Sequence, residues 1–549
     1  MTCLRHVFIV SFILLVTNST NGLLSVRKHI IDPPESVTLR NTRTTSNLYF
    51  EQKIDNFNHA DTRTWKQRYH LSEDYYNETS KNHVFLLLGG EWEAIDTWLN
   101  YGSWIDTAKQ YGALLIYLEH RYYGISQPFS DLSTENLQYL SIHQALEDTA
   151  NFIEGINNIY NLTSDVKWIV FGGSYAGTMA AWMRHKYPHL VTGAMSSSAP
   201  LKAILDFHEY LQVVRNSLAT HSIACVDNIK EAFAELEELV ASCLEDVEIY
   251  QELDEMFQLC DSIELSEGNE KDLSTLFEVL TDDIFAYVTQ YNGRLQVSID
   301  DLCEIMVNDT EGYSMLQRLG QVNSLMLNTT STNCTDFKYT NFLGKLQNTT
   351  IKASSMMRQW VYQTCTEFGF FQTSSQEVPI FGSRFDVSFF TDLCVDLFGE
   401  NFNETLTNMG IHATNTRYGA TNIATSNIVY FHGAIDPWHP LGKLETSDDI
   451  NDSVIIVEDA SHCMNMQPSK ETDSEALQEA RKSIDKLIGQ WLTSTSANDD
   501  DTDDSNDDDN KDNDGTDDSN DDTNSSNRIT GNIIFTLSTF FLFLIYLIA

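Results

Sequence analysis

The chain has 549 residues and a formal net charge of −45 at pH 7, because 79 acidic side chains face 34 Lys and Arg. This charge argues against nucleic-acid binding, which needs a basic surface to displace counterions from phosphates. Hydrophobic residues make up 42% of the chain, so a large buried core is expected over most of its length.

Residues 1–22 have the pattern of a secretory signal peptide. Arg5 precedes an apolar run over 7–16 that is too short to span a membrane, and small polar residues follow up to Gly22. The chain has nine cysteines, and cleavage would remove Cys3 and leave eight, an even number that suits disulfides in an oxidising compartment. Their spacing is not that of a metal site, so we expect no metal. The expected location is the secretory pathway, ending at the cell surface or in a lysosome or vesicle.

Asn-x-Ser/Thr triplets predict a glycosylated exterior, although each triplet alone is weak evidence. The predicted acceptors are Asn77, Asn161, Asn308, Asn328, Asn333, Asn348, Asn403 and Asn451, with a further triplet at Asn524.

Apolar, strand-like runs recur in the first part of the chain, at 84–88, 113–118 and 167–171. Helix-like segments such as 141–156 separate them. This alternation predicts a parallel sheet, and we assign 45–204 to the first part of a sheet-containing domain.

The strand-like run 167–171 leads into Gly172-Gly173-Ser174-Tyr175-Ala176-Gly177 and then into a helical stretch. A nucleophilic serine on a sharp strand-to-helix turn needs small neighbours, because side chains at the flanking positions would not fit. Ala176 replaces the glycine of the strict Gly-x-Ser-x-Gly pattern, but alanine is also small. A strand-ending loop without chemistry is the alternative interpretation.

After a further run at 190–195 the strand pattern stops, and 205–418 reads as an inserted, mainly helical cap domain. Strand-like runs return at 427–431 and 453–457, followed by an amphipathic helix, so 419–495 completes the first domain. The order of these elements predicts an α/β-hydrolase: a parallel-rich sheet with a large helical cap.

Triads on this fold run in the order serine, acid, histidine along the chain. Asp436 follows the run 427–431, and His462 follows the run 453–457. A serine hydroxyl is a poor nucleophile, so an imidazole must take its proton and a carboxylate must orient the imidazole. Ser174, His462 and Asp436 fit these roles. His432 and His439 come too early in this order, and Asp459 is better suited to capping its own loop.

The negative charge of a tetrahedral intermediate needs backbone N–H donors. We expect one from Tyr175, directly after the serine, and a second from Gly90 or Glu91, which follow the run 84–88. Gly89 and Gly90 could equally serve only to form the turn after this run.

The C-terminal region differs from the rest in composition. Residues 496–532 contain an Asp/Asn/Ser tract that cannot bury enough apolar surface to fold, and we expect a disordered stalk rather than a calcium site. Residues 533–549 are apolar, and the small residues Asn524-Ser525-Ser526 before them fit a signal that is exchanged for a glycolipid anchor. A short transmembrane helix is the alternative.

Several separated blocks resemble the serine carboxypeptidases of the prolyl type, peptidase family S28. The resemblance spans roughly 48–490, and the stretch 171–210 looks most like the thymus-specific branch. Besides 171–177, the blocks include Leu88-Gly89-Gly90-Glu91, Glu119-His120-Arg121-Tyr122-Tyr123-Gly124, Ser197-Ser198-Ala199-Pro200, Trp360-Val361-Tyr362-Gln363-Thr364-Cys365-Thr366-Glu367, Asp436-Pro437-Trp438 and Ser461-His462-Cys463.

The resemblance implies Ser174, Asp436 and His462 as the triad, a Cys365–Cys394 disulfide, no cofactor, and cleavage of peptides after proline near a chain end. Prolyl carboxypeptidases carry a second histidine where this chain has Cys463, so the direction of cleavage stays open. The alternative functions are an esterase or lipase on the same fold and an inactive surface binding protein.

Overall fold

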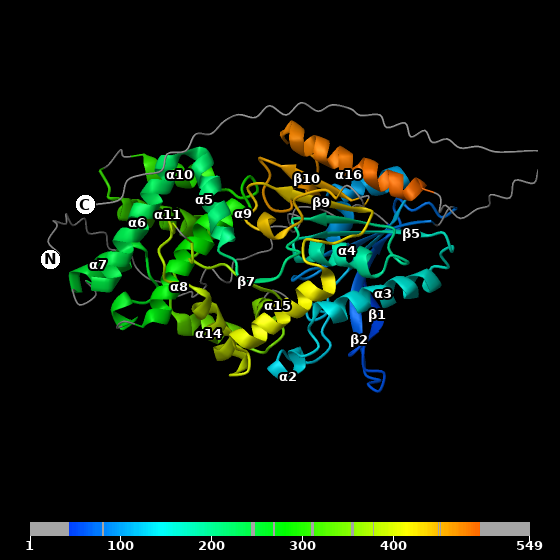
Figure 1. Ribbon diagram of the computed structural model, residues 1–549, viewed down its shortest axis with the longest axis horizontal. Coiled ribbons are helices and arrows are strands. Elements are labelled where there is room, and N and C mark those ends of the chain that lie inside the picture. Colours follow the sequence, from blue (N-terminus) through cyan, green and yellow to red (C-terminus); the bar gives the residue numbers. More distant parts are fainter. Residues whose placement is uncertain are drawn as a thin grey trace, which may run out of the picture. The chain divides into compact units, whose positions relative to one another are not determined.

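The computed structural model describes residues 43–494, except for 80–81, 243–246, 267–268, 309–311, 353–355, 377, 448–449 and 451 (Figure 1). The predicted signal peptide, stalk and tail lie outside these residues, as do the acceptors Asn451 and Asn524. Within the described stretches, no helix is both long enough and apolar enough to cross a membrane.

The centre of the fold is an eight-stranded sheet in the order β1-β2-β4-β3-β5-β6-β9-β10. β1 pairs antiparallel with β2, and β2 with β4, whereas all other neighbouring strands are parallel. This confirms the predicted α/β-hydrolase fold with a parallel-rich sheet. The strands are β1 (Thr44–Lys53), β2 (Thr64–Ser72), β3 (His83–Leu88), β4 (Leu114–Leu118), β5 (Lys167–Gly173), β6 (Gly193–Ser197), β9 (Ile428–Gly433) and β10 (Ser453–Val457).

The central strands are apolar along their length because helices cover both faces of the sheet. α16 (Glu475–Thr493) lies on one side of the sheet, and α3 (Ile142–Ile159) lies on the other (Figure 1). α1 (Trp104–Tyr111) packs Trp104 against Phe171 of β5, with ring centroids 5.8 Å apart. α4 (Tyr175–Lys186) follows β5 directly and is buried over its first nine residues. The short elements η2 (Asp96–Asn100), α2 (Thr134–Leu137), η6 (His439–Leu441) and η7 (Met464–Met466) lie in the connections.

The segment between β6 and β9 is mainly helical, as predicted, and it includes two π-helical turns, η4 and η5. It also contains a pair of short parallel strands, β7 and β8, that sequence reasoning did not anticipate. The sheet and this helical segment fall within one compact unit that ends at Ser494, so the domain boundaries at 205 and 418 stay predictions. The elements are β7 (Ile204–Asp206), α5 (Glu209–His221), α6 (Ile223–Ser242), α7 (Val247–Met256), η3 (Ile263–Ser266), α8 (Glu270–Leu280), η4 (Thr281–Ala286), α9 (Tyr287–Gln290), α10 (Ile299–Val307), α11 (Met315–Thr330), α12 (Tyr339–Leu346), α13 (Met357–Gln363), η5 (Thr364–Phe368), β8 (Gly369–Phe371), α14 (Val387–Phe398) and α15 (Glu404–Tyr418).

Three disulfides cross-link this helical segment: Cys225–Cys303, Cys260–Cys334 and Cys365–Cys394. The last is the pair that the family resemblance implies. Cys463 lies outside the segment as a buried free thiol, and Cys243 is outside the described residues. All seven predicted glycan acceptors within the described residues are exposed, namely Asn77, Asn161, Asn308, Asn328, Asn333, Asn348 and Asn403, and their glycosylation stays a prediction.

Gly193 of β6 offers a test of how closely α16 packs on the sheet. A Cβ added there would overlap Cε3 of Trp491, a ring that is 3% exposed. We expect Gly193→Ala to lower the free energy of unfolding by about 1–3 kcal/mol through overpacking, measured by urea denaturation.

Gly344→Ala is the matched control, because an added Cβ in the exposed part of α12 meets nothing within 4 Å. It should leave stability unchanged or raise it by up to about 1 kcal/mol. Equal stability of the two variants would contradict the tight packing of α16.

Candidate active site

Ser174 sits on a sharp turn between β5 and α4, with φ 57° and ψ −131°. A Cβ at Gly172 would overlap the carbonyl oxygen of Ala176, and a Cβ at Gly177 would lie 2.6 Å from the carbonyl oxygen of Ser197. The small residues around the serine are therefore a steric requirement, as the sequence predicted. The left-handed backbone of a non-glycine residue is strained and persists only where its surroundings hold it.

Two other strained residues lie at the same edge of the sheet. Ser198 (φ 49°) follows β6, and Cys463 (φ 55°) lies in the loop after β10. The backbone N–H of Cys463 donates to the Ser198 hydroxyl at 2.8 Å, and that of Ser174 donates to the carbonyl of Ser197 at 2.9 Å. A Cβ at Gly173 would lie 2.9 Å from the Cys463 Sγ. The segments that carry the predicted serine and histidine thus converge.

His462 and Asp436 form a buried pair at this edge. Nδ1 of His462 lies 2.9 Å from both carboxylate oxygens of Asp436, and neither residue is exposed to solvent. Because a carboxylate accepts hydrogen bonds, Nδ1 carries a proton, and in the neutral imidazole the lone pair is therefore on Nε2. Among the described residues, the buried Nε2 has no hydrogen-bond partner. This tautomer is the one that a general base needs.

The two groups shift each other's pKa. Burial by itself lowers the pKa of His462, but the Asp436 carboxylate and Cys463 together outweigh burial and raise it above its ordinary value. Burial likewise raises the pKa of Asp436, but His462 outweighs it and holds it below its ordinary value. The Trp438 N–H donates to Asp436 Oδ1 at 3.0 Å and adds to this effect. The pair is therefore set to stabilise an imidazolium.

Of the three alternative residues, His439 and Asp459 have other partners. His439 Nδ1 bonds to the backbone carbonyl of Asp436 at 2.8 Å, not to its carboxylate. Asp459 accepts a hydrogen bond from the Ser474 hydroxyl at 3.1 Å, next to the start of α16. Burial lowers the pKa of His432 to about 4, so its imidazole stays neutral at pH 7.

The predicted oxyanion residues lie beside the serine turn. Tyr175 is the first residue of α4, and a Cβ on Gly90 would lie 3.5 Å from the Cβ of Ala176. Burial raises the pKa of the partly buried Glu91 to about 7, and the charge of His462 acts on the same carboxyl group. Glu91 Oε2 is buried and makes no hydrogen bond to any described residue. The loop after β3 therefore brings a buried carboxyl oxygen without a hydrogen-bond partner among the described residues to the site.

Helices of the inserted segment, which the sequence predicts to be a cap, reach the same place. At the end of α9, the carbonyl of Gln290 accepts from the His462 N–H at 3.0 Å, and its side-chain oxygen accepts from Trp438 Nε1 at 3.0 Å. Arg294 Nη1 donates to the carbonyl of His462 at 3.1 Å. These contacts hold the histidine and aspartate loops from above the sheet edge.

An aromatic cluster extends from Tyr175 to Trp438. It combines the ring of Tyr175 in α4 and that of Trp438 after β9 with rings of the inserted segment. Centroids of neighbouring rings are 5.3–6.2 Å apart, and the cluster contains Tyr175, Trp360, Phe368, Phe370, Trp438, Phe207 and Tyr210. Within the described residues, no group of His, Cys, Asp and Glu side chains is arranged to hold a metal ion.

Comparisons with known proteins agree with the resemblance. A family model for serine carboxypeptidase S28 matches residues 52–484. The thymus-specific serine protease of Mus musculus is 33% identical over 458 residues, which cover 81% of this chain and 87% of that protein. Its Homo sapiens counterpart is 31% identical over 456 residues, covering 81% and 86%. The lysosomal Pro-X carboxypeptidase of Mus musculus is 28% identical over 476 residues, covering 82% and 90%.

The raised pKa of Glu91 predicts a pH-dependent stability. The folded protein favours the neutral carboxyl, so this contribution is complete below about pH 4.5 and is lost as the pH rises through about 7. Between pH 5 and 8, the wild type should lose about 2 kcal/mol of unfolding free energy relative to Glu91→Gln. Denaturant unfolding at several pH values measures this difference.

Glu479→Gln, on the exposed surface of α16, is the control and should follow the wild type at each pH. If the Glu91→Gln variant also follows the wild type, Glu91 is not desolvated in the folded protein.

Proposed function

Because the chain belongs to the serine carboxypeptidase S28 family, we propose that it is an exopeptidase that forms an acyl-enzyme on Ser174. Ser174 Oγ attacks the peptide carbonyl while His462 Nε2 takes the hydroxyl proton. The imidazolium then gives this proton to the leaving amine, and a water molecule hydrolyses the ester by the same route. Asp436 stays ionised and stabilises the imidazolium.

The observation that carries this proposal is the pair of 2.9 Å contacts from His462 Nδ1 to Asp436, with Nε2 left without a hydrogen bond among the described residues. The N–H groups of Tyr175 and of Gly90 or Glu91 are the proposed donors to the oxyanion. In a buried site, such donors stabilise developing charge more strongly than water does.

A fluorophosphonate probe tests the nucleophile. The wild type should be labelled on Ser174, as peptide mass spectrometry would verify, and Ser174→Ala should take up no probe. Asp436→Asn should lower kcat by about 10⁴-fold, because the imidazole would lose the correct tautomer.

Labelling of Ser174→Ala at the wild-type rate would refute the proposed nucleophile. A folded wild type without probe uptake would favour the inactive binding protein, and faster turnover of acyl esters than of peptides would favour an esterase.

The aromatic cluster supports a preference for proline. A pyrrolidine ring is apolar and rigid, and Trp360, the partly exposed ring that packs on the buried rings of Tyr175 and Phe368, provides an apolar surface near the serine turn. Two side chains of opposite charge near His462 are candidates for binding the charged end of the peptide. Glu91 would hold a terminal ammonium, and Arg294 would hold a terminal carboxylate.

Product mass spectrometry on peptides with proline at varied distances from each end tests specificity and direction together. We expect cleavage after proline near one end only, because a single charged side chain would bind that end of the peptide and so determine which bond lies next to the serine. Glu91→Gln should reduce kcat/KM about 10-fold or more if release is from the N-terminal end, and Arg294→Gln should do so if it is from the C-terminal end. Cleavage at internal prolines of long peptides blocked at both ends would contradict an exopeptidase.

The three disulfides fit an oxidising compartment, and the lysosomal relatives support a secretory or lysosomal location. Anchoring through residues 533–549 lies outside the described residues and stays a prediction.

A further inference from the structure

The side chain of Tyr175, the residue after the proposed nucleophile, is enclosed by both parts of the chain. Its ring is 2% exposed. The ring of His120, after β4, lies 5.5 Å away on the sheet side. Trp360 and Phe368, from α13 and η5, lie at 5.6 and 5.7 Å. The residue whose backbone N–H faces the reaction is thus held by its side chain.

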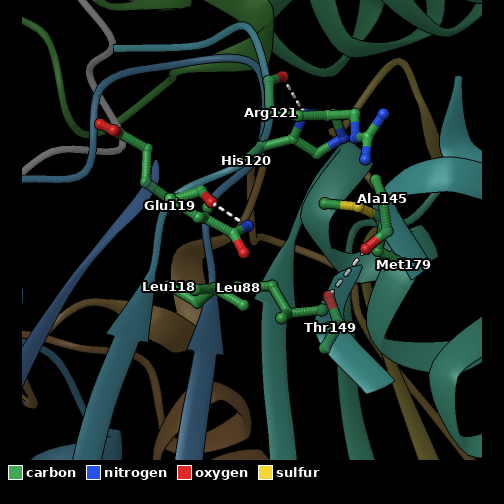
Figure 2. Close-up of a pocket in the computed structure, with 10 residues that line it drawn as sticks. Leu88, Leu118, Glu119, His120, Arg121, Ala145, Thr149 and Met179 are labelled. Atoms are coloured by element: carbon green, nitrogen blue, oxygen red, sulfur yellow. Dashed lines mark hydrogen bonds between the residues drawn. The ribbon is translucent and has the colours of Figure 1, made fainter. Parts of the chain in front are cut away.

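The hydrogen bond between Tyr175 and His120 has a defined direction. His120 Nδ1 lies 2.6 Å from the backbone carbonyl of Arg121, as Figure 2 shows. A carbonyl only accepts, so Nδ1 carries the hydrogen and Nε2 is an acceptor. The Tyr175 hydroxyl, 3.0 Å from Nε2, therefore donates to it. Burial lowers the pKa of His120 to about 3, which keeps the imidazole neutral.

Gln363, the last residue of α13, completes the bonding of this hydroxyl. Its amide Nε2 donates to Tyr175 at 2.9 Å and to Glu367 Oε2 at 3.2 Å. Its Oε1 accepts from the Tyr123 hydroxyl at 2.6 Å. When Glu367 is ionised, a flipped amide would place Oε1 against its carboxylate, where two acceptors repel, so the carboxylate favours this orientation of Gln363.

Glu367 is itself held by the start of α3. Its two carboxylate oxygens accept from the backbone N–H of Ile142 at 3.0 and 3.2 Å, where the helix dipole favours negative charge. Burial nevertheless raises the pKa of Glu367 to about 7, although Gln363, Ile142 and the more distant Arg417 lower it.

The turn that carries Glu367 is fixed from the other side as well. η5 includes Cys365, which is bonded to Cys394, and the Cys365 carbonyl accepts from the Thr407 hydroxyl at 2.9 Å. A Cβ at Gly410 of α15 would overlap the carbonyl oxygen of Thr366. A disulfide, a helix and a hydrogen bond thus anchor the residues that reach Tyr175.

We propose that Gln363 is a positioning residue, through which the inserted segment fixes the side chain of Tyr175 and thereby aligns the first turn of α4 with the substrate carbonyl. This inference rests on the proposed function, because it takes Ser174 as the nucleophile and the Tyr175 N–H as an oxyanion donor. Gln363 does not touch the reacting atoms, and its effect passes through Tyr175.

The test compares Gln363→Met with Gln359→Met, because methionine keeps the length of the side chain and removes the amide. Gln359 lies one turn earlier on α13, is also buried, and donates to the backbone carbonyl of Tyr122 at 3.0 Å rather than to the site. Gln363→Met should lower kcat about 10- to 100-fold with KM within about twofold, the range expected from a small misplacement of the catalytic turn. Gln359→Met should leave kcat within about twofold, with a similar change in Tm.

Tyr175→Phe allows a second measurement, which distinguishes the positioning role of Gln363 from a purely structural role. Because Gln363 acts through the Tyr175 hydroxyl, the double variant Tyr175→Phe/Gln363→Met should have the kcat of the slower single variant, not the product of two losses. Additive losses, an unchanged kcat for Gln363→Met, or equal losses for both glutamine variants would each overturn the inference.

The fluorophosphonate rate separates this inference from the proposed function. If the probe labels the wild type and labels Gln363→Met more slowly, the result supports both the proposed function and the positioning role of Gln363. Equal labelling rates overturn the positioning role alone, whereas the absence of labelling in the folded wild type overturns the proposed function.

Discussion

The chemistry of this fold depends on a steric constraint: the turn at Ser174 leaves no space for side chains at Gly172 and Gly177. Because glycines occupy these positions, the chain can turn directly from β5 into α4. The serine is then held in a strained conformation at the edge of the sheet where the parallel strands end. The neighbouring strands β6, β9 and β10 end at the same edge, so their loops supply Ser198, Asp436 and His462 without long excursions. The sheet order, rather than any local sequence, brings together residues separated by nearly three hundred positions.

The segment from Glu119 to Gly124 is one of the blocks that carry the family resemblance. Three of its side chains make hydrogen bonds that stabilise this edge of the sheet. His120 accepts from the Tyr175 hydroxyl, and Tyr123 donates to Gln363. Arg121 forms two hydrogen bonds with the buried Asp148, at 2.6 and 2.7 Å, and so ties the loop to α3. Breaking one partner of such a buried pair is costly, because the other charge stays desolvated. One short loop therefore fixes the tyrosine, the inserted segment and α3 relative to one another.

Local patterns allowed part of this to be predicted. The apolar runs predicted the bounds of β3, β5, β9 and β10 closely, and the small residues around Ser174 predicted the turn. Both the apolar runs and the small residues are patterns of neighbouring residues, so they can be recognised in the sequence. The roles of Gln363 and Glu367 could not be inferred this way, because a buried glutamine has no periodic signal and the partners of these two residues come from the loop after β4, from α3 and from α4. Disulfide pairing has the same difficulty, because eight cysteines allow about 105 connectivities, and among the pairs formed the family resemblance implied Cys365–Cys394 alone. The pair β7–β8 was missed because three-residue strands are too short to show alternation.

The inserted segment is more than a cover over the site. Gln290 bonds to the histidine loop and to Trp438, while Gln363 bonds to the residue after the serine, so the segment contacts the loops of all three proposed triad residues. A rigid displacement of the segment would break these hydrogen bonds together and leave buried polar groups unpaired, at a cost of about 1–3 kcal/mol for each group. The alignment of the site and the position of the segment are therefore coupled.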